Sequence, residues 1–365
     1  MNPIEPYQPF QREPIQFHSS SITSSTQKEA KEIKIVSKEF IFDNAPFPTC
    51  HASTIIEIEP GIFMAAWFGG TREKAPDVGI WTSIYRNETW SIPKETVKHD
   101  GMPFWNPVLF KMPSGEILLF YKHGPNPREW LGFLARSLDS GETWNQEEHI
   151  VLSNGEKGLG PIKNKPLLLE DGTLICGTSV EDQQPNICYT EYSKDGGKTW
   201  ERSGSIGPLY LNDKTYGIIQ PTLLQTNNGL IMLGRPRDNL GHVWYSKSLD
   251  QGLSWSLVEK LDFPSPDSGL DAITLKDGRH LLVYNHTKSG RKRLDVAISN
   301  DGKNWTHILN LEEYIPSPCD VMHVQEKKEP IEFSYPAVIQ SKDGRVHITY
   351  TWNRKRVSHV ILEEI

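Results

Sequence analysis

The chain has 365 residues, and 39 Lys and Arg against 46 Asp and Glu give it a net charge of −7. A hydrophobic content of 37% with 10% aromatic residues is enough to build a sizeable core, which excludes wholesale disorder. The acidic balance disfavours nucleic acid and anionic membranes as partners, because neither attracts a net-negative protein.

Residues 1–31 are rich in Pro, Ser, Thr and Gln, and we expect them to form an N-terminal arm. They lack the basic region and apolar run of a signal peptide, and no apolar run approaches the roughly 18 residues that span a bilayer. The four cysteines, Cys50, Cys176, Cys188 and Cys319, lie far apart and match no zinc-binding spacing. We therefore expect free thiols, a cytoplasmic location, and neither a metal nor a cofactor.

Residues 32–42 (EIKIVSKEFIF) predict a strand, and six hairpins follow it. In each hairpin two short apolar or β-branched runs meet at a turn glycine. These glycines are Gly61, Gly115, Gly172, Gly229, Gly278 and Gly344.

A second motif recurs in phase with the hairpins. It reads SLDSGETW at 137–144, SKDGGKTW at 193–200, SLDQGLSW at 248–255 and, one residue shorter, SNDGKNW at 299–305. A decayed copy ends at Trp90, so the tryptophans stand at 90, 144, 200, 255 and 305, separated by 54, 56, 55 and 50 residues. The Asp and Ser side chains can bond turn backbone groups and the Trp can pack the turn, so we expect these boxes to be structural.

Four strands per period of about 55 residues predict a blade of a β-propeller. The expected fold is all-β: one domain over residues 32–365, with six four-stranded antiparallel blades. After the last hairpin only one strand remains, at about residues 356–362. Pairing residues 32–42 with it would complete the last blade and remove the open sheet edges.

Polar residues at the starts of the inner strands and the ends of the second strands should converge on one concave site. They combine bases, carboxylates, amides and aromatic rings, a mixture that suits a sugar ligand. The candidates are His51, Arg72, Asp77, Trp105, Asn106, Lys122, Lys163, Lys165, Glu181, Gln220, Arg235, Arg237, Asp271, Asn285, Tyr335 and Trp352.

The S-x-D-x-G-x-T-W boxes on a six-blade period resemble the sialidase (neuraminidase) superfamily of Asp-box propellers. The loop FGGTREKAPD, residues 68–77, is similar to the sialidase loop that holds an arginine and the general-acid aspartate, which implies these roles for Arg72 and Asp77. The family grips the substrate carboxylate with three arginines. Arg235 or Arg237 resembles the second of these, and Arg291 or Arg293 stands in the region of the third.

This sequence departs from the family at two positions. His51 stands where the first arginine would be, and Phe333 stands at the position of the nucleophilic tyrosine. Tyr335 lies two residues later, on the same strand face, and can take the nucleophile's place. Glu181 is the candidate for the glutamate that activates it.

Three functions follow from these residues. The leading expectation is an exo-acting glycosidase that hydrolyses a terminal, acidic sugar from a glycan. The second is a lyase of the rhamnose–glucuronate type, in which His51 abstracts the proton α to a uronate carboxylate. The third is a glycan-binding propeller without catalysis. All three expect a carbohydrate partner.

Overall fold

The computed structural model describes residues 32–98, 101–145, 148–181, 184–315 and 331–364. Within these ranges strands are the only regular secondary structure, and no helix is long and apolar enough to cross a membrane. Ile33–Ile365 form one compact unit. The expected arm of residues 1–31 and Cys319 lie outside the described residues, and the other three cysteines are buried free thiols.

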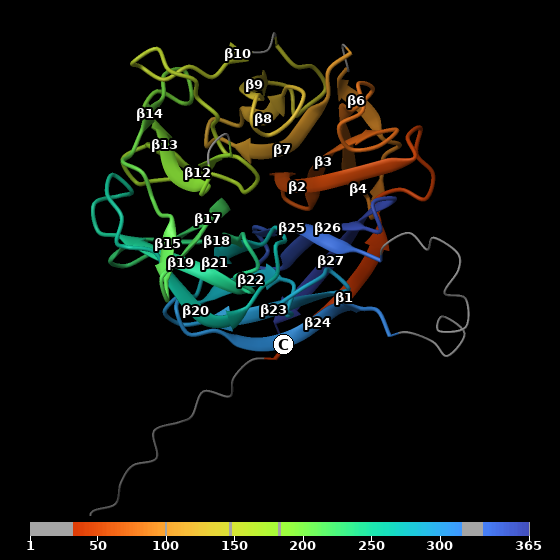
Figure 1. Cartoon of the computed structure of the whole chain (residues 1–365). Helices are drawn as coiled ribbons and strands as arrows, with labels where there is room; N and C mark the ends of the chain where they lie inside the picture. Colours follow the sequence, from red (N-terminus) through yellow and green to blue (C-terminus); the bar gives the residue numbers. More distant parts are fainter. Residues whose placement is uncertain (1–31, 99–100, 146–147, 182–183, 316–330, 365) are drawn as a thin grey trace, which may run out of the picture. The chain divides into compact units, whose positions relative to one another are not determined.

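Six antiparallel sheets are arranged in turn around a common axis, as Figure 1 shows. Blade 1 consists of β2 (Thr49–Glu59), β3 (Ile62–Gly70), β4 (Gly79–Arg86), β5 (Thr89–Trp90) and β6 (Lys94–Val97). Blade 2 consists of β7 (Phe104–Lys111), β8 (Ile117–His123), β9 (Leu131–Ser137) and β10 (Glu148–His149). Blade 3 consists of β11 (Leu167–Leu168), β12 (Leu174–Val180), β13 (Ile187–Ser193) and β14 (Glu201–Arg202). A hairpin of β15 (Leu209–Leu211) and β16 (Lys214–Tyr216) leads to blade 4.

Blade 4 consists of β17 (Ile218–Thr226), β18 (Gly229–Pro236), β19 (His242–Ser248) and β20 (Glu259–Pro264). Blade 5 consists of β21 (Asp271–Thr274), β22 (His280–Tyr284), β23 (Arg293–Ser299) and β24 (Thr306–Glu313). Blade 6 consists of β25 (Phe333–Gln340), β26 (Val346–Trp352), β27 (Arg356–Glu364) and β1 (Ile33–Phe40). The predicted six-bladed propeller is confirmed.

The last blade is completed by the first strand of the chain, as predicted. β1 pairs antiparallel with β27, from Ile33 opposite Glu364 to Phe40 opposite Ser358. Figure 1 shows the orange β1 beside the blue β27. Pairing the two ends of the described unit leaves no gap in the ring, since every blade then has a neighbour on both sides.

Six apolar clusters fill the six spaces between neighbouring blades. Met64 and Phe68 of blade 1, for example, pack with Leu109 and Leu119 of blade 2. The last space holds Trp67 of blade 1 with Val357 of blade 6. Because each blade buries both of its faces, the inner strands are apolar along nearly their whole length and only their ends carry functional side chains.

The recurring boxes are structural, as expected. In the box of blade 2, Asp139 accepts hydrogen bonds from the backbone nitrogen and the hydroxyl of Thr143 at 2.9 and 2.5 Å. Gly141 has φ +90°, and a side-chain carbon there would lie 2.0 Å from Met64 of blade 1. The turn therefore requires glycine, and the box locks one blade against the next.

Candidate functional site

The same β-bulge starts the inner strands of blades 1, 2, 4 and 6. In each, the strand register shifts around one residue with a left-handed backbone. These residues are Ala52 (φ 56°), Asn106 (39°), Gln220 (50°) and Tyr335 (53°). A bulge redirects a side chain that a regular strand would bury between blades. In these four blades the bulge lies at the end of the channel where the inner strands begin, which we call the channel mouth.

Tyr335 is the centre of the arrangement. Its hydroxyl oxygen accepts hydrogen bonds from Arg235 Nη1 at 2.6 Å and from Gln220 Nε2 at 3.1 Å. A side-chain carbon at Gly269 would lie 3.2 Å from the Tyr335 ring, so glycine leaves the space that the phenol occupies. The β17–β18 hairpin of blade 4 thus holds the phenolic oxygen of a residue 100 positions later in the sequence, and both donors stabilise negative charge on it.

Cationic groups surround the Tyr335 ring. The guanidinium carbons of Arg235 and Arg291 lie 5.7 and 5.6 Å from the ring centre, and the Lys163 ammonium lies 5.8 Å from it. Arg235 is 7% exposed. A negative charge that forms beside Tyr335 would be stabilised in a partly water-free environment, where electrostatic interactions are stronger than in water.

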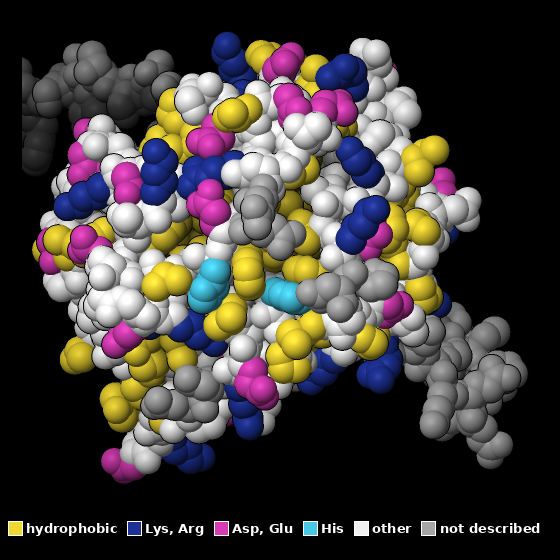
Figure 2. Space-filling view, turned by 90° about the horizontal axis from the view of Figure 1, so that it is seen from above, with side chains coloured by type: hydrophobic (Ala, Val, Ile, Leu, Met, Phe, Trp, Pro, Cys, Tyr) yellow, Lys and Arg dark blue, Asp and Glu magenta, His cyan; other side chains and the backbone are white. Residues whose placement is uncertain are grey.

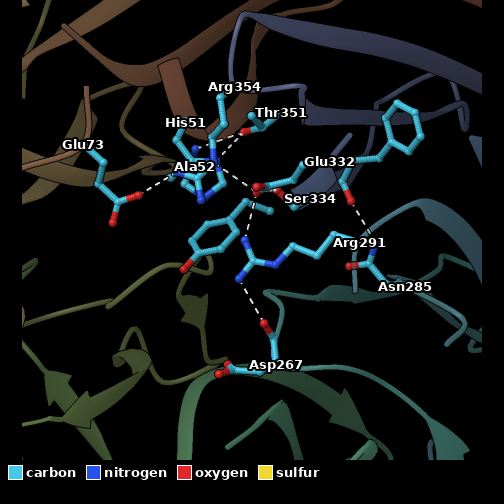
Figure 3. A network of polar contacts seen from close by, with 12 residues as sticks. His51, Ala52, Glu73, Asp267, Asn285, Arg291, Glu332, Ser334, Thr351 and Arg354 are labelled. Carbon is cyan, nitrogen blue, oxygen red and sulfur yellow. Dashed lines mark hydrogen bonds and ion pairs between the residues drawn. The ribbon is translucent and has the colours of Figure 1, made fainter. Parts of the chain in front are cut away.

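Two carboxylates hold the arginines in place. Asp267 pairs with Arg235 Nε at 2.5 Å and with Arg237 Nη1 at 2.8 Å. Glu332 pairs with Arg291 Nη1 at 2.8 Å and with Arg354 Nε at 3.1 Å, and Figure 3 shows Arg291 extending between Glu332 and Asp267. Burial alone would raise the pKa of Glu332, but Arg291 and Arg354 hold it below its usual range.

His51 lies beside Tyr335, among the same cationic side chains. Its Nδ1 is 2.9 Å from the hydroxyl of Thr351, and its ring centre is 4.0 Å from that of Tyr335. Burial, together with Arg354 and Arg291, lowers the pKa of His51 well below its usual value. The imidazole is therefore uncharged at neutral pH.

The predicted residues Lys163, Lys165 and Asp271 join blades beneath the mouth. Lys163 Nζ donates to Asn164 Oδ1 at 2.9 Å and to the Leu270 carbonyl at 3.3 Å, and it also contacts the Pro336 carbonyl. Burial lowers the pKa of Lys163 to about 7. Asp271 accepts bonds from Lys165 at 2.8 Å and from the Val338 backbone nitrogen at 3.0 Å. These contacts tie blades 3, 5 and 6 together.

Three other candidates are engaged in internal contacts. The Lys122 side chain is fully buried and donates to the Pro161 carbonyl at 2.9 Å. It therefore cannot reach a ligand at the mouth, although the sequence predicted that it would. Trp105 is also buried, and its indole nitrogen donates to the Gly124 carbonyl, so it offers no open platform for a sugar. Asn285 donates to the Phe333 carbonyl at 2.8 Å and fixes the start of β25.

The remaining candidates stand in loops or near strand ends at the mouth. Asp77 accepts bonds from the backbone nitrogen of Thr71 at 2.9 Å and from its hydroxyl at 2.5 Å, which close the loop after β3. Glu181 follows β12, and burial raises its pKa although Arg235 and Arg237 oppose this. Arg72 is exposed. Asn106 donates to the Ile162 carbonyl at 3.1 Å, and Trp352 packs edge-on against Phe40.

The structure also resolves the two alternatives for the third arginine and adds residues that were not predicted. Arg291 faces Tyr335, whereas Arg293 pairs with Asp295. Arg354, Glu332, Asp267 and Thr351 were missed. Arg354 follows Trp352 by two residues at the end of β26, so the rule that selected Trp352 could have found it. Asp267 lies in a loop without a repeat signal.

The outer surface differs in charge from this mouth. Figure 2 views the side of the molecule on which blade 2 lies in Figure 1, and basic and acidic side chains are intermingled there without a region of one sign. The close-packed arginines belong to the mouth, and no extended basic surface is visible on that side.

A family model described as "BNR repeat-like domain" matches residues 61–348. The chain is also 28% identical over 197 residues to a sialidase of Bacteroides fragilis (strain YCH46). That alignment covers 49% of this chain and 35% of the relative, so the chain matches about a third of the relative's length.

Solved structures share the fold at low identity. A protein of unknown function from Dyadobacter fermentans has a TM-score of 0.72 at 18% identity, over 91% of this chain and 99% of that one. The NanB sialidase of Streptococcus pneumoniae has a TM-score of 0.66 at 15% identity, over 90% of this chain and 70% of that one. A Trypanosoma rangeli sialidase in complex with sialic acid has a TM-score of 0.65 at 14% identity, over 87% of this chain and 55% of that one.

Proposed function

Because this chain belongs to the BNR repeat-like domain family, within the sialidase superfamily, we propose that it is an exo-glycosidase that hydrolyses a terminal acidic sugar from a glycan. The observation that carries the proposal is the grouping of Arg235, Arg291 and Arg354 at one channel mouth, around Tyr335 and His51. Guanidinium groups donate charge-assisted hydrogen bonds to carboxylates, which suits an acidic sugar.

Each of these arginines keeps one nitrogen for a ligand. The other nitrogens donate to carboxylates, to the Asp267 backbone carbonyl, to the Gln220 amide oxygen and to the Tyr335 hydroxyl. In contrast, Nη2 of Arg235, Nε of Arg291 and Nη2 of Arg354 make no hydrogen bond with a described residue. Asp267 and Glu332 fix the guanidinium planes before a ligand arrives. A substrate carboxylate would meet donors that are already oriented, which reduces the entropy cost of binding.

Tyr335 is the proposed nucleophile. Its oxygen would attack the anomeric carbon while Arg235 and Gln220 stabilise the phenolate. Glu181, whose pKa burial raises, would be the base that takes the phenolic proton, acting beside Arg235. A carboxylate with a raised pKa is a stronger base than an exposed one.

Asp77 is the proposed general acid. It stands in the loop after β3, and Thr71 fixes one of its two carboxyl oxygens through two hydrogen bonds. The orientation of the carboxyl is thereby set by its own loop, so it can be held above the glycosidic oxygen of a bound sugar.

The elimination reaction is less well supported than hydrolysis. Its base would be His51, which is 2% exposed and whose pKa lies well below the usual value. A base with a depressed pKa is poorly matched to removing a weakly acidic proton at neutral pH.

One experiment separates the three functions. The wild-type protein is offered the 4-methylumbelliferyl glycosides of N-acetylneuraminic acid and of glucuronic acid, with fluorescence as the readout. It is also offered a glucuronide that carries rhamnose on O4, the leaving group that elimination requires, with absorbance near the ultraviolet edge as the readout. Hydrolysis releases the fluorophore from one of the methylumbelliferyl glycosides, and Tyr335→Phe should lower kcat/KM on the order of 10³-fold. The matched control is Tyr210→Phe, because Tyr210 is 73% exposed on the outer hairpin.

Other outcomes would contradict hydrolysis. An ultraviolet-absorbing unsaturated uronate would assign elimination, since only elimination leaves a conjugated double bond. Binding of sialyllactose or of a glucuronide without turnover of either would assign a glycan-binding propeller. Full activity of Tyr335→Phe would remove Tyr335 from the mechanism.

A further inference from the structure

A second concavity lies at the opposite end of blade 4 from the arginines. Strand β17 carries Gln220 at the mouth and Gln225 five residues later, a separation of roughly 16 Å along a strand. Around Gln225, a cavity of about 890 Å³ opens between blades 3, 4 and 5. It is within the 300–1,000 Å³ range of sites that hold small molecules.

The walls of this cavity are rich in side-chain amides. Gln225, Asn227, Asn228 and Gln251 line it, and the hydroxyl-bearing Thr226 and Thr274 lie between them. Among the described lining residues Glu170 is the only charged one. The chemistry therefore differs from that of the mouth, where ion pairs dominate.

The amides are not used by the fold. None of the four amide groups makes a hydrogen bond with a described residue, whereas Thr226 itself closes the hairpin turn by accepting from the Asn228 backbone nitrogen and donating to the Gly229 carbonyl. The side chains of Asn227 and Asn228 thus project from a turn that is complete without them.

Blade 4 differs here from its sister blades. In blades 3, 5 and 6 the corresponding turn residues are Asp171, Asp277 and Asp343, and each carboxylate accepts the backbone nitrogen two residues later. The repeat therefore provides a simpler turn that blade 4 does not use. Blades 1 and 2 also lack this carboxylate, with Pro60 and Ser114 before the turn glycine, but the pair of asparagines stands in the blade that carries the cavity.

Leu249 adds an apolar surface to the same cavity and is 76% exposed. A sugar ring offers hydroxyl groups at its edge and C–H groups on its face. Amides donate to and accept from hydroxyl groups, while an exposed leucine covers C–H groups. An uncharged, hydroxyl-rich ligand matches both features.

We propose that this cavity, formed around Asn227 and Asn228 of the blade 4 hairpin, binds a neutral oligosaccharide. The site is separate from the mouth and does not depend on the function proposed there.

The test uses the full chain and two neutral probes, cellotriose and triacetylchitotriose, with saturation-transfer NMR and titration calorimetry. We expect at least one probe to bind, and the double variant Asn227→Ala/Asn228→Ala to weaken its binding about tenfold or more, since two hydrogen-bonding amides are lost. Leu249→Ser, a second and independent variant, should also weaken it.

Two controls keep the result specific. Asn44→Ala removes an exposed amide elsewhere on the surface that makes no side-chain hydrogen bond with a described residue, and Arg291→Lys alters the mouth; both should leave the affinity unchanged. The proposal is overturned if neither trisaccharide binds. It is also overturned if binding survives both cavity variants, or if it is lost in Arg291→Lys. A failure of hydrolysis at the mouth would leave these affinities unaffected.

Discussion

The ring of His51 lies against that of Tyr335, with 4.0 Å between their centres. The hydroxyl oxygen of Thr351 accepts a hydrogen bond from the Ala52 backbone nitrogen at 3.2 Å and lies 2.9 Å from His51 Nδ1. His51 thus places an uncharged imidazole ring beside the phenol, where the resemblance to the family implies an arginine.

His51 should therefore remain neutral across the physiological range. In two-dimensional NMR spectra of imidazole nitrogens, we expect the signals that disappear in His51→Gln to stay constant from pH 5 to pH 8, because burial and the nearby arginines lower its pKa. In the unfolded protein the same residue should titrate near about 6.5. A titration of His51 in the folded protein within that range would contradict the assignment.

The arginines should determine affinity for acidic substrates. Arg291→Lys and Arg354→Lys each remove planar donors while keeping the charge, and we expect KM for an acidic glycoside to rise about 10-fold to 100-fold with a smaller change in kcat. Arg293→Lys is the matched control, since Arg293 pairs with Asp295. Equal effects of all three variants would mean that the site does not bind a carboxylate through this pair.

The acid side of the pH–rate profile should report Glu181. Burial raises its pKa, and only its ionised form can take the Tyr335 proton, so activity should fall as the pH drops through that raised pKa. Glu181→Gln should lower kcat and flatten this limb, whereas Glu170→Gln, on the far side of the propeller, should not. An unchanged acid limb in Glu181→Gln would exclude Glu181 as the base.

The role of Asp77 as general acid can be tested with substrates whose leaving groups differ in how much they need protonation. Asp77→Asn should slow hydrolysis of a glycan, whose alkoxide leaves poorly, by about 10²-fold to 10⁴-fold. A methylumbelliferyl glycoside needs less protonation, so its hydrolysis should be slowed much less. If both substrates lose the same factor, Asp77 contributes to binding or folding and not to proton transfer.

Lys163 should make stability depend on alkaline pH. Burial lowers its folded-state pKa to about 7, against about 10.4 when unfolded, so between these values the unfolded chain binds more protons. The free energy of unfolding should therefore gain an increment with rising pH in this window, of at most about 1.4 kcal/mol per pH unit. Lys163→Met should remove that increment, while Lys198→Met, in an exposed turn, should retain it. Parallel pH curves for the wild type and Lys163→Met would contradict this.

The sequence by itself determined the fold. The boxes ending at Trp144, Trp200 and Trp255 repeat with the hairpins, and a repeat of local turns needs only local hydrogen bonds, which short-range sequence encodes. The closure by residues 32–42 was also predictable, because six hairpins leave the last blade with one strand missing. The sequence also identified Tyr335, Arg235 and Gln220 as site candidates, and in the structure Arg235 and Gln220 donate hydrogen bonds to the Tyr335 hydroxyl.

Only the tertiary structure decided which polar side chains belong to the site. Lys122 and Trp105 satisfy the same positional rule as Arg354, yet they are buried between blades while Arg354 pairs with Glu332 beside His51. Alternation along a strand states which face a residue occupies, but not whether a neighbouring blade covers that face. That depends on packing between segments that are hundreds of residues apart, as for His51 and Thr351. The composition first pointed to a net-acidic protein, and the fold is what concentrates its arginines at one channel mouth.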